Sequence, residues 1–351
     1  MGQENPAENQ RELRFGIVGT GLIADVLARS IERADNARLS AVSSRRQETA
    51  DAFIADRPDV AAGAVAVEGV DALLAREDVD AVYVATPTSA KEEIALAAID
   101  AGKHVLVDKP FTSADSAQRM IEAASARGVL FMDATHFVHH PRTIAIRSRL
   151  PELLGRPRSL HTAFYFPFSD RDNIRFDVEA EPMGAHGDMA WYSMRAIVEY
   201  LRPEGAVTGV AVHAERDEAT GAVVRTSGLV QFAGGQSSTF DVGYTAGTVL
   251  MDLSLLGTDG VVSMDDFVLD WHESFAFQNE ALAAGFTHRA GMATRGEFSF
   301  HGTPSHKPGD VLMVERFAEL TADPAAGAAH GQATIETQQL LDQTWAAIAD
   351  G

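Results

Sequence analysis

Cysteine is absent from this 351-residue chain. Its absence excludes disulfides, thiol nucleophiles and zinc sites with cysteine ligands. Basic residues are also scarce, because 29 Lys and Arg stand against 50 Asp and Glu, a formal net charge of −21. Nucleic acids and anionic membranes both attract clustered Lys and Arg, so this charge argues against either partner. We interpret the acidic excess as a surface that keeps the protein soluble.

Long hydrophobic runs are absent too. No segment approaches the roughly 20 apolar residues of a membrane span, and the first residues are polar, without the apolar core of a secretory signal. We therefore expect residues 1–13 to form a disordered tail and the protein to lie in the cytoplasm. With 46% hydrophobic residues, the chain is long enough for two domains and a large core.

The first part of the chain alternates between short apolar strands and helical patterns. Gly102 and Gly128 follow two of the expected helices as C′ residues, and Thr112 with Asp115 fits a capping box before the second of these helices. This alternation predicts a parallel sheet covered on both faces, an α/β domain over residues 14–137. The expected strands are 14–18, 39–42, 81–84, 104–107 and 129–132, and the expected helices are 22–31, 48–54, 92–101 and 116–126.

The pattern changes after about Phe137. Strand patterns, many of them alternating, follow one another with turn signals between them. They predict an α+β domain with a large open, antiparallel or mixed sheet over residues 138–351. Segment 322–331 is expected to be a loop, and the last helix can pack back on the first domain. The expected strands are 159–166, 207–215, 223–232, 237–244 and 249–256, and the expected helices are 188–201 and 335–348.

A glycine-rich turn joins the first expected strand to the first helix. It reads Gly19-Thr20-Gly21-Leu22-Ile23, followed by a small alanine. One glycine allows a tight turn, the second lets the backbone approach a pyrophosphate, and the small residue lets helix and strand pack closely. Free N–H groups at the helix start favour phosphate. In this strand–turn–helix context the motif predicts a dinucleotide site at residues 19–23.

The end of the second strand carries no acidic residue. An NAD site places Asp or Glu about 20 residues past the glycine loop to accept the ribose hydroxyls, but this chain has Ser43-Ser44-Arg45-Arg46. Hydroxyls and a guanidinium would bind a 2′-phosphate that a carboxylate would repel. We therefore expect NADP(H) to be preferred over NAD(H), with Ser43, Ser44 and Arg45 at the cofactor. The alternative is an exposed basic turn.

Two further segments end strands at the same edge of the expected sheet: Thr86-Pro87 and Asp108-Lys109. Ligands bind outside the carboxyl ends of parallel strands, so these segments and the glycine loop should converge on one crevice beside the cofactor. A lysine near the positive nicotinamide has reason to titrate low and to give or take a proton, which makes Lys109 a catalytic candidate. The alternative is a surface ion pair between Lys109 and Asp108.

A third candidate segment runs from Gly184 to Tyr192. If a helix begins at Asp188, then Asp188 and Tyr192 lie one turn apart on the same face. The Tyr192 phenol could donate a proton to a carbonyl oxygen, and Asp188 could cap the helix, bind a substrate hydroxyl or tune a neighbour. The alternative is that Asp188 is only an N-cap and Tyr192 only a buried aromatic residue.

The histidines at 136, 139 and 140 invite a metal interpretation. No Asp, Glu or Cys pattern completes such a site, so we expect ordinary core or cleft histidines and no metal.

Four segments together resemble the Gfo/Idh/MocA family of NAD(P)-dependent oxidoreductases, named for glucose–fructose oxidoreductase and inositol dehydrogenase. The resemblance covers nearly the whole chain, and the run Gly-Lys-His-Val-Leu-Val-Asp-Lys-Pro is quite specific to the family. The four segments are residues 15–21, 80–87, 102–110 and 184–192.

The resemblance implies an N-terminal Rossmann domain and a C-terminal α+β domain whose open sheet commonly forms the oligomer interface. It implies that Lys109 is the catalytic or nicotinamide-side lysine and Asp188 the acid of the substrate cleft. Tyr192 falls where many members have His, and where a Tyr-bearing subset, including dihydrodiol and ketosugar reductases, uses Tyr as acid/base. Further substrate-binding candidates are Arg175, His136 and His186.

Some positions depart from the family pattern. Asp108 stands where Glu is commoner, and Thr88 and Lys91 replace a frequent Asn and His. These changes leave open which sugar or polyol is used.

We expect an oxidoreductase that moves hydride between NADP(H) and a secondary alcohol or ketone of a sugar, sugar derivative, polyol or trans-dihydrodiol. In reduction, either Tyr192 or Lys109 protonates the alkoxide while the other orients and stabilises it. The alternative is a non-catalytic dinucleotide sensor of the same fold, against which the retained acid/base residues argue. Expected partners are a small-molecule substrate and further copies of the chain, as a homodimer or homotetramer through the C-terminal sheet.

Overall fold

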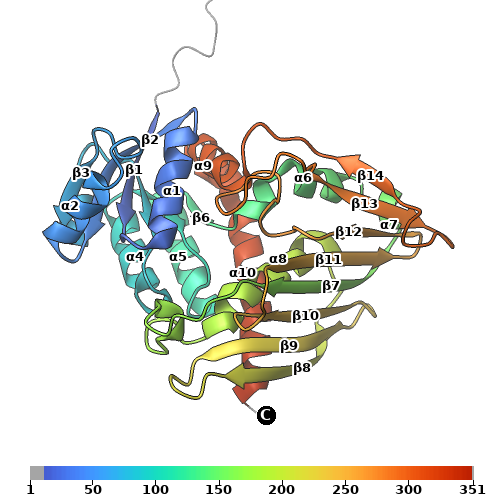
Figure 1. Cartoon of the computed structure of the whole chain (residues 1–351). Helices are drawn as coiled ribbons and strands as arrows, with labels where there is room; N and C mark the ends of the chain where they lie inside the picture. Colours follow the sequence, from blue (N-terminus) through green and yellow to red (C-terminus); the bar gives the residue numbers. More distant parts are fainter. Residues whose placement is uncertain (1–11, 350–351) are drawn as a thin grey trace, which may run out of the picture.

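The computed structural model describes residues 12–349 and contains two sheets (Figure 1). The first sheet is parallel throughout, in the order typical of dinucleotide-binding domains, which confirms the expected Rossmann fold. The expected tail lies outside the described residues except for its end, where Leu13 already belongs to a strand. Across the sheet the strands are β3 (Val65–Glu68), β2 (Ala37–Ser44), β1 (Leu13–Val18), β4 (Ala81–Val84), β5 (His104–Val107) and β6 (Phe131–Asp133).

Helices connect these strands, and each buries one apolar stripe. The expected capping box before α5 is wrong, because Ser113 rather than Thr112 is the N-cap and its side chain accepts the Ser116 N–H at 3.1 Å. Gly128 ends α5 at a φ of 72°, as expected for a C′ glycine. The helices are α1 (Leu22–Arg33), α2 (Gln47–Ala55), α3 (Val70–Leu74), α4 (Lys91–Asp100) and α5 (Ala114–Arg127).

One helix from the far end of the chain also covers the first sheet. Helix α9 (Gly309–Leu320) packs on α1, and its Phe317 ring lies 5.5 Å from that of Phe15 in β1. The core of the Rossmann sheet is therefore completed by residues that follow the second sheet in sequence.

The second sheet is mixed, since β10 pairs with β7 in parallel and all other neighbours are antiparallel. This confirms the expected large open sheet and adds three strands, β12 to β14, that the sequence patterns did not indicate. In order across the sheet, its strands are β14 (Ser299–Gly302), β13 (Gly285–Ala290), β12 (Gly260–Met264), β11 (Leu250–Gly257), β7 (Pro157–Tyr165), β10 (Ser237–Gly243), β9 (Val223–Phe232) and β8 (Val207–Arg216).

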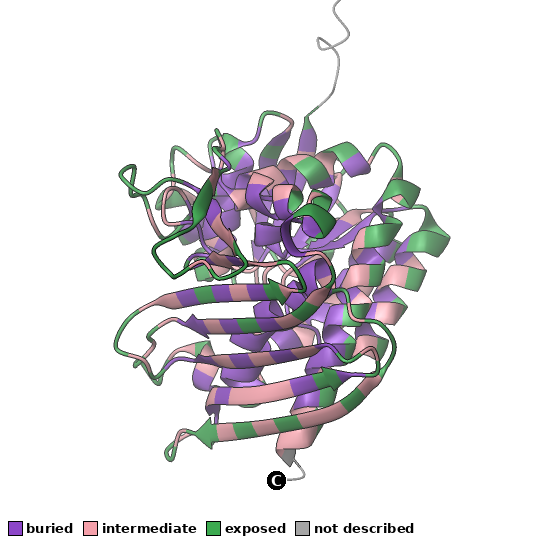
Figure 2. Cartoon of the chain, turned by 90° about the vertical axis from the view of Figure 1, so that its right-hand side faces the viewer, coloured by how far each residue is buried: buried purple, intermediate pink, exposed green. Residues whose placement is uncertain are grey.

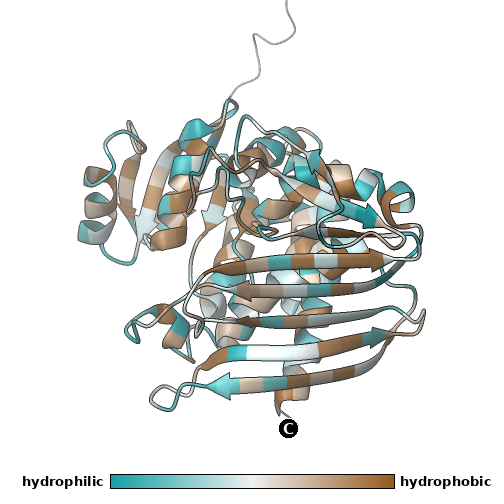
Figure 3. Cartoon of the chain, turned by 45° about the vertical axis from the view of Figure 1, so that its right-hand side comes forward, coloured by the Kyte–Doolittle hydropathy of each residue, from teal (hydrophilic) through white to brown (hydrophobic). Residues whose placement is uncertain are grey.

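One face of this sheet packs on helices, and no helix of the described residues covers the other (Figure 2). Buried and exposed residues alternate along its strands (Figure 2), as do hydrophobic and hydrophilic ones (Figure 3). Strand pairing aligns one row of side chains, small or polar apart from Leu229, across the uncovered face: Ala211, Leu229, Thr239, His161, Ser254, Ser263 and Thr287.

Two long helical segments fill the space between the sheets. The first runs without a break through η4 (His186–Ala190), α8 (Trp191–Ala196) and η5 (Ile197–Leu201), with π-helical turns at both ends. The second, α10 (Ala328–Ala349), contacts β8, α8, α5 and β6. The expectation of a loop over 322–331 is therefore wrong, since a 3₁₀ turn and the start of α10 occupy most of it.

Short helices complete the connections. None of the helices within residues 12–349 combines the length and apolarity needed to cross a bilayer. The short helices are η1 (Thr88–Ala90), η2 (His136–His139), α6 (Pro141–Ser148), α7 (Leu150–Leu154), η3 (Ile174–Phe176) and η6 (Pro324–Gly327).

Candidate active site

Three loops meet at the carboxyl ends of β1, β4 and β5, as the strand order predicts. Modelling a Cβ on Gly19 would bring it to 2.6 Å from the Ala85 carbonyl oxygen, so the glycine loop and the turn after β4 touch. The Asp108 N–H donates to the Val84 carbonyl at 3.1 Å, which holds the turn after β5 beside them. The crevice lies where the strand order reverses around β1, the usual ligand position in such sheets.

The two glycines of the first loop differ in what they require. Gly19 has a φ of 117°, a backbone conformation that residues other than glycine rarely adopt. Gly21 has an ordinary φ of −79°, and a Cβ there would meet nothing within 4 Å. Neither packing nor strain demands glycine at 21, and no side chain caps α1. Open space in front of uncapped helix N–H groups fits a pyrophosphate.

The tip of β2 divides its polar residues into two groups. Ser43 is buried and its hydroxyl donates to the Gly69 carbonyl at 2.7 Å, so its hydrogen is committed within the fold. Ser44 is half-buried, whereas Arg45 and Arg46 are exposed. No hydrogen bond or ion pair within residues 12–349 engages either guanidinium. Both arginines are therefore free to bind an anion at this end of the strand.

The Thr86 side chain supplies an unpaired polar atom in the same crevice. Its buried hydroxyl oxygen has no hydrogen-bond partner among the described residues. Buried polar groups are almost always paired, so an unpaired one at a strand end fits contact with a bound ligand.

Lys109 and Asp188 form the centre of the site. The Lys109 Nζ donates to Asp188 twice, to the backbone oxygen at 2.8 Å and to Oδ1 at 2.6 Å. The other carboxylate oxygen, Oδ2, accepts from Arg175 Nε at 2.7 Å and from the Tyr244 hydroxyl at 3.2 Å. A half-buried carboxylate thus bridges two cations from different parts of the chain.

The ion pairs set the charge states of these groups. Burial favours the neutral acid, but Arg175 and Lys109 together outweigh it and hold the pKa of Asp188 well below its usual range. Burial also opposes the charge on Lys109, yet Asp188 outweighs it and raises the pKa of Lys109 above its ordinary value. Both groups are therefore charged at neutral pH.

This geometry bears on three interpretations of the sequence. Lys109 pairs with Asp188 rather than with Asp108. Asp188 is not an N-cap, because the helix begins at His186 and the carboxylate turns to Lys109 instead. Asp188 raises the pKa of Lys109 in this structure, and the expectation that a bound nicotinamide makes Lys109 titrate low stays a prediction.

Tyr192 follows Asp188 by one turn and lies beneath the lysine. The Lys109 Nζ is 4.8 Å from the centroid of the Tyr192 ring. Burial raises the pKa of Tyr192 to about 12, against the lowering effect of Lys109, so the phenol keeps its proton at neutral pH. No hydrogen bond from the part of the chain described here engages the Tyr192 hydroxyl.

Arg175 belongs to the same cluster, and Tyr244 joins it unexpectedly. The Arg175 guanidinium lies 4.3 Å above the Phe168 ring while it pairs with Asp188. Tyr244 directly follows β10. Its position at a strand end was a possible signal, but the alternation of β10 made it resemble an ordinary sheet residue.

The two histidine candidates have different surroundings. The His136 ring packs against Tyr192 at 5.8 Å and edge-on against Phe275, and its buried Nε2 has no partner among the described residues. Burial lowers the pKa of His136 to about 3. His186 is not at the site: its two ring nitrogens face Thr226 and Thr344 in the core.

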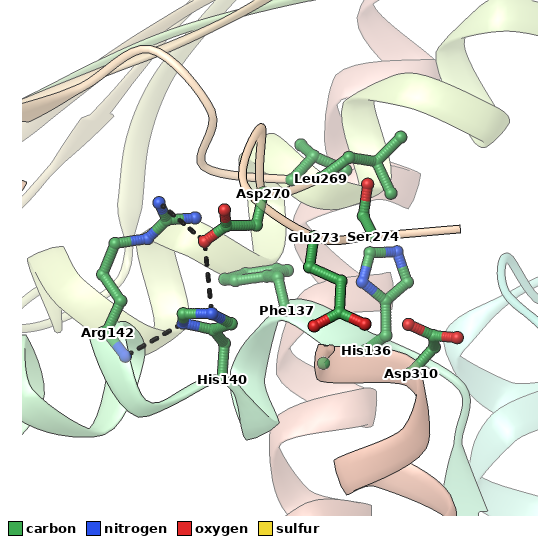
Figure 4. A pocket seen from close by; sticks show the side chains of 11 residues that line it. His136, Phe137, His140, Arg142, Leu269, Asp270, Glu273, Ser274 and Asp310 are labelled. Atoms are coloured by element: carbon green, nitrogen blue, oxygen red, sulfur yellow. Dashed lines mark hydrogen bonds and ion pairs between the residues drawn. The ribbon is translucent and has the colours of Figure 1, made fainter. Parts of the chain in front are cut away.

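A small pocket adjoins His136 (Figure 4). There His140 Nε2 lies 3.2 Å from Asp270 Oδ2, and Arg142 approaches the same carboxylate at 3.6 Å. No group of three or more His, Asp or Glu side chains within residues 12–349 could hold a metal ion. Polar side chains of this pocket pair with one another. They do not converge on a point at which a metal ion could be bound.

Residues 13–135 match the oxidoreductase family described as GFO_IDH_MocA, with an NAD-binding Rossmann fold. Over nearly its full length the chain is 31% identical to a dTDP-3,4-didehydro-2,6-dideoxy-alpha-D-glucose 3-reductase of Streptomyces violaceoruber, with 92% of this chain and 97% of that protein aligned. The enzyme of the same name from Actinomadura kijaniata is 35% identical over 61% of this chain and 63% of its own length.

A solved structure shows the same fold. The 3-ketoreductase KijD10 from Actinomadura kijaniata, in complex with NADP and TDP-benzene, superposes with a TM-score of 0.82 at 24% identity, over 96% of this chain and 98% of that one. The full-length sequence match, the Rossmann loop and the fold agree. The chain belongs to the Gfo/Idh/MocA family of NAD(P)-dependent oxidoreductases.

Proposed function

We propose that the protein is an NADP(H)-dependent ketosugar reductase or sugar dehydrogenase. The observation that carries this proposal is the placement of Lys109, which is ion-paired with Asp188, over the ring of Tyr192 at the carboxyl edge of the Rossmann sheet next to the glycine loop. A cofactor bound along that loop would supply or accept the hydride. The residues of this chain would bind and protonate the substrate oxygen.

Lys109 can hold a substrate oxygen through the hydrogen it has left. An ammonium has three N–H donors, and Asp188 takes two of them. The third has no acceptor among the described residues. A fixed ammonium at this point stabilises negative charge that develops on a carbonyl oxygen during reduction, and it needs no reorganisation to do so.

Tyr192 is the better candidate for the proton donor. Loss of the Lys109 proton would break the ion pair with Asp188, whereas no acceptor in the described residues holds the Tyr192 proton. The tyrosinate left behind would lie beside the Lys109 cation, which lowers the pKa of the phenol. In this assignment Tyr192 donates the proton while Lys109 keeps its charge.

Turnover of two variants tests these roles. Lys109→Met should lower kcat more than a hundredfold and leave the Kd for NADPH within a few-fold, because it removes the charge but not the glycine loop. Tyr192→Phe should lower kcat ten- to a hundredfold with an unchanged KM. Near-normal turnover of Lys109→Met would refute the catalytic role. An unchanged kcat in Tyr192→Phe would identify Lys109, rather than Tyr192, as the proton donor.

We propose NADP(H) as the preferred cofactor because Arg45 and Arg46 are exposed beside Ser44 and have no hydrogen bond or ion pair of their side chains within residues 12–349. Arg45→Ala should weaken NADPH binding about tenfold and leave NADH binding unchanged, as the loss of one charge-assisted contact predicts. Parallel fluorescence titrations with both cofactors measure this. An equal loss for both cofactors would show that Arg45 does not contact a 2′-phosphate.

The substrate we propose is a keto group on a sugar ring. The full-length relative from Streptomyces violaceoruber is named as a 3-reductase of a dTDP-linked didehydro-deoxyglucose. NADPH oxidation should therefore be measured first with nucleotide-linked ketosugars, then with free aldoses and inositols. Tight NADPH binding without turnover of any ketone in this panel would favour a sensor.

We also propose that two or more copies associate through the uncovered face of the second sheet. The aligned row of side chains there forms a surface on which a second sheet can lie. Light scattering on the purified protein measures the assembly.

A further inference from the structure

A second buried lysine lies directly behind the active-site turn. Lys91, the first residue of α4, is only 2% exposed. Its Nζ donates to the backbone oxygen of Lys109 at 2.8 Å, to that of Pro110 at 3.0 Å, and to Thr88 Oγ1 at 3.2 Å. Lys91 therefore forms hydrogen bonds to the backbone at Lys109, the residue whose side chain lies at the centre of the site.

The hydrogen bonds require Lys91 to be an ammonium. Thr88 Oγ1 gives its own hydrogen to Glu181 Oε2 at 2.6 Å, so it can only accept from Lys91. The two carbonyl oxygens can only accept as well. Three acceptors need three N–H donors, and a neutral amine has two.

The charged groups around Lys91 come from several elements. Burial lowers the pKa of Lys91, and so does the Lys109 cation, while Asp108, Glu181 and Asp188 favour its charge. Because the acceptors need all three hydrogens, we place Lys91 in its charged form despite its burial.

The hydrogen bonds of Thr88 continue into the segment that follows Arg175 and η3. Glu181 accepts from Thr88 twice, from the backbone N–H at 3.0 Å and from the hydroxyl at 2.6 Å. Next to it the Ser89 N–H donates to the Ala180 carbonyl at 3.2 Å. The segment between η3 and η4 is thus tied to η1, and through Thr88 to Lys91.

We propose that Lys91 is a positioning residue that, with Thr88 and Glu181, fixes Lys109 and the Arg175 loop against each other. The inference rests on the proposed function, in which Lys109 binds the substrate oxygen. Lys91 touches neither substrate nor cofactor. It fixes the backbone from which the Lys109 side chain reaches Asp188, while the Glu181 arm holds the loop whose Arg175 reaches the other oxygen of the same carboxylate.

Lys103 offers a matched control at the other end of β5. Its Nζ donates to the Arg76 and Val79 backbone oxygens, each at 2.8 Å. Lys103 precedes β5 and Lys109 follows it, so the control lies at the opposite edge of the sheet. Lys103→Met removes a comparable pair of ammonium–carbonyl bonds without touching the active-site turn.

The first measurement is turnover at saturating NADPH. Lys91→Met should lower kcat at least tenfold with the Kd for NADPH within threefold, whereas Lys103→Met should keep wild-type kcat. Thr88→Val, nearly isosteric, removes the hydroxyl that donates to Glu181 and accepts from Lys91, and keeps both bonds from Lys91 to the carbonyl oxygens of Lys109 and Pro110. It should raise the KM of the substrate several-fold and change kcat less, because it frees the Arg175 loop and leaves the Lys109 carbonyl held.

A second measurement does not depend on activity. Competitive acetylation with isotopic acetic anhydride, read by mass spectrometry, reports the reactivity of each lysine against pH. Lys91→Met should increase the reactivity of Lys109 at least fivefold at pH 8, because a displaced Nζ loses part of its pairing with Asp188. Lys103→Met should leave it unchanged. If Lys91→Met does not fold, the KM of Thr88→Val tests the positioning role through the Glu181 arm.

The two proposals fail in different ways. If the wild-type protein reduces no ketone but Lys109 becomes reactive in Lys91→Met, the proposed function fails and the positioning role stands. If kcat and Lys109 reactivity in Lys91→Met equal those of Lys103→Met, or if Thr88→Val alone folds and leaves KM unchanged, the positioning role is overturned.

Discussion

The Asp188 carboxylate is the negative charge that pairs with both cations of the site. It accepts from an ammonium, a guanidinium and a phenol, each from a different element. Pairing with two cations keeps a half-buried carboxylate charged. Lys109 and Arg175, both positive, can approach one another only because this negative charge lies between them.

Removal of that charge should change the pH dependence of the reaction. In Asp188→Asn, burial would act on Lys109 without the carboxylate that raises its pKa most. Lys109 should then lose its proton at lower pH, so kcat should fall between neutral and alkaline pH, at least one unit earlier than in the wild type. Tyr244→Phe removes a neutral hydrogen bond and should leave the pH profile in place. Superimposable profiles for Asp188→Asn and the wild type would contradict this assignment.

At the residue scale, strand-end logic predicts Lys109, and helical spacing pairs Asp188 with Tyr192. Arg175 is indicated by resemblance. Glu181 carries no comparable signal, because a single carboxylate in a loop is typical of solvent-exposed positions and only the fold brings it to Thr88. His186 is the opposite case. It lies within a motif that indicates a site, but both of its ring nitrogens face threonines of the core.

At the scale of elements, the turn between β1 and α1 combines two constraints of different origin. Gly19 meets the Ala85 carbonyl and takes a left-handed φ, so the fold itself requires glycine there. Gly21 has neither constraint. Whatever selects glycine at 21 must lie outside the folded chain, and a phosphate approaching the start of α1 is such a group.

Two alanine variants separate these constraints. Gly19→Ala should destabilise the protein by about 1–3 kcal/mol, because a strained φ and a clash with backbone cannot both relax. Gly21→Ala should leave stability within about 0.5 kcal/mol and weaken NADPH binding at least tenfold. Urea denaturation and fluorescence titration measure the two effects. Wild-type affinity in Gly21→Ala would place the pyrophosphate elsewhere.

The elements that sequence patterns predicted best are the buried strands. The bounds expected for β4, β5 and β9 agree with the structure, because short apolar runs between turn residues have few alternatives. The edge strands β3 and β14 are short and mostly exposed, so their sequences carry little apolar pattern. Helix α9 also carries a pattern, the helical spacing of Val311, Val314 and Phe317, but it is missing from the elements expected from the sequence.

Across the whole molecule, buried histidines make stability depend on pH. Burial lowers the pKa of His136 to about 3 and of His186 to about 4, and holds that of His139 well below 6.5. Below pH 6.5 the unfolded chain takes up protons at these positions and the folded chain does not. Stability is therefore complete above pH 6.5 and falls as the pH drops toward 4.

The expected loss is about 1 kcal/mol per buried histidine between pH 6.5 and 5.5. Urea denaturation at pH 7.5, 6.5 and 5.5 measures it. His186→Gln keeps a polar side chain that cannot titrate and lies away from Lys109, so it should reduce the loss by roughly the share of one histidine. An unchanged loss in this variant would mean that His186 does not supply it.

Helix α10 reaches both sheets from one stretch of chain. Thr334 donates to Asp133 at the end of β6, Gln338 accepts from Phe111, and Thr344 contacts His186. All these partners are synthesised well before α10 emerges from the ribosome. Until α10 emerges, both sheets lack this cover, although all of their strands precede it in the chain. The two sheets can therefore form during synthesis, but their packing against each other is completed only when α10 docks.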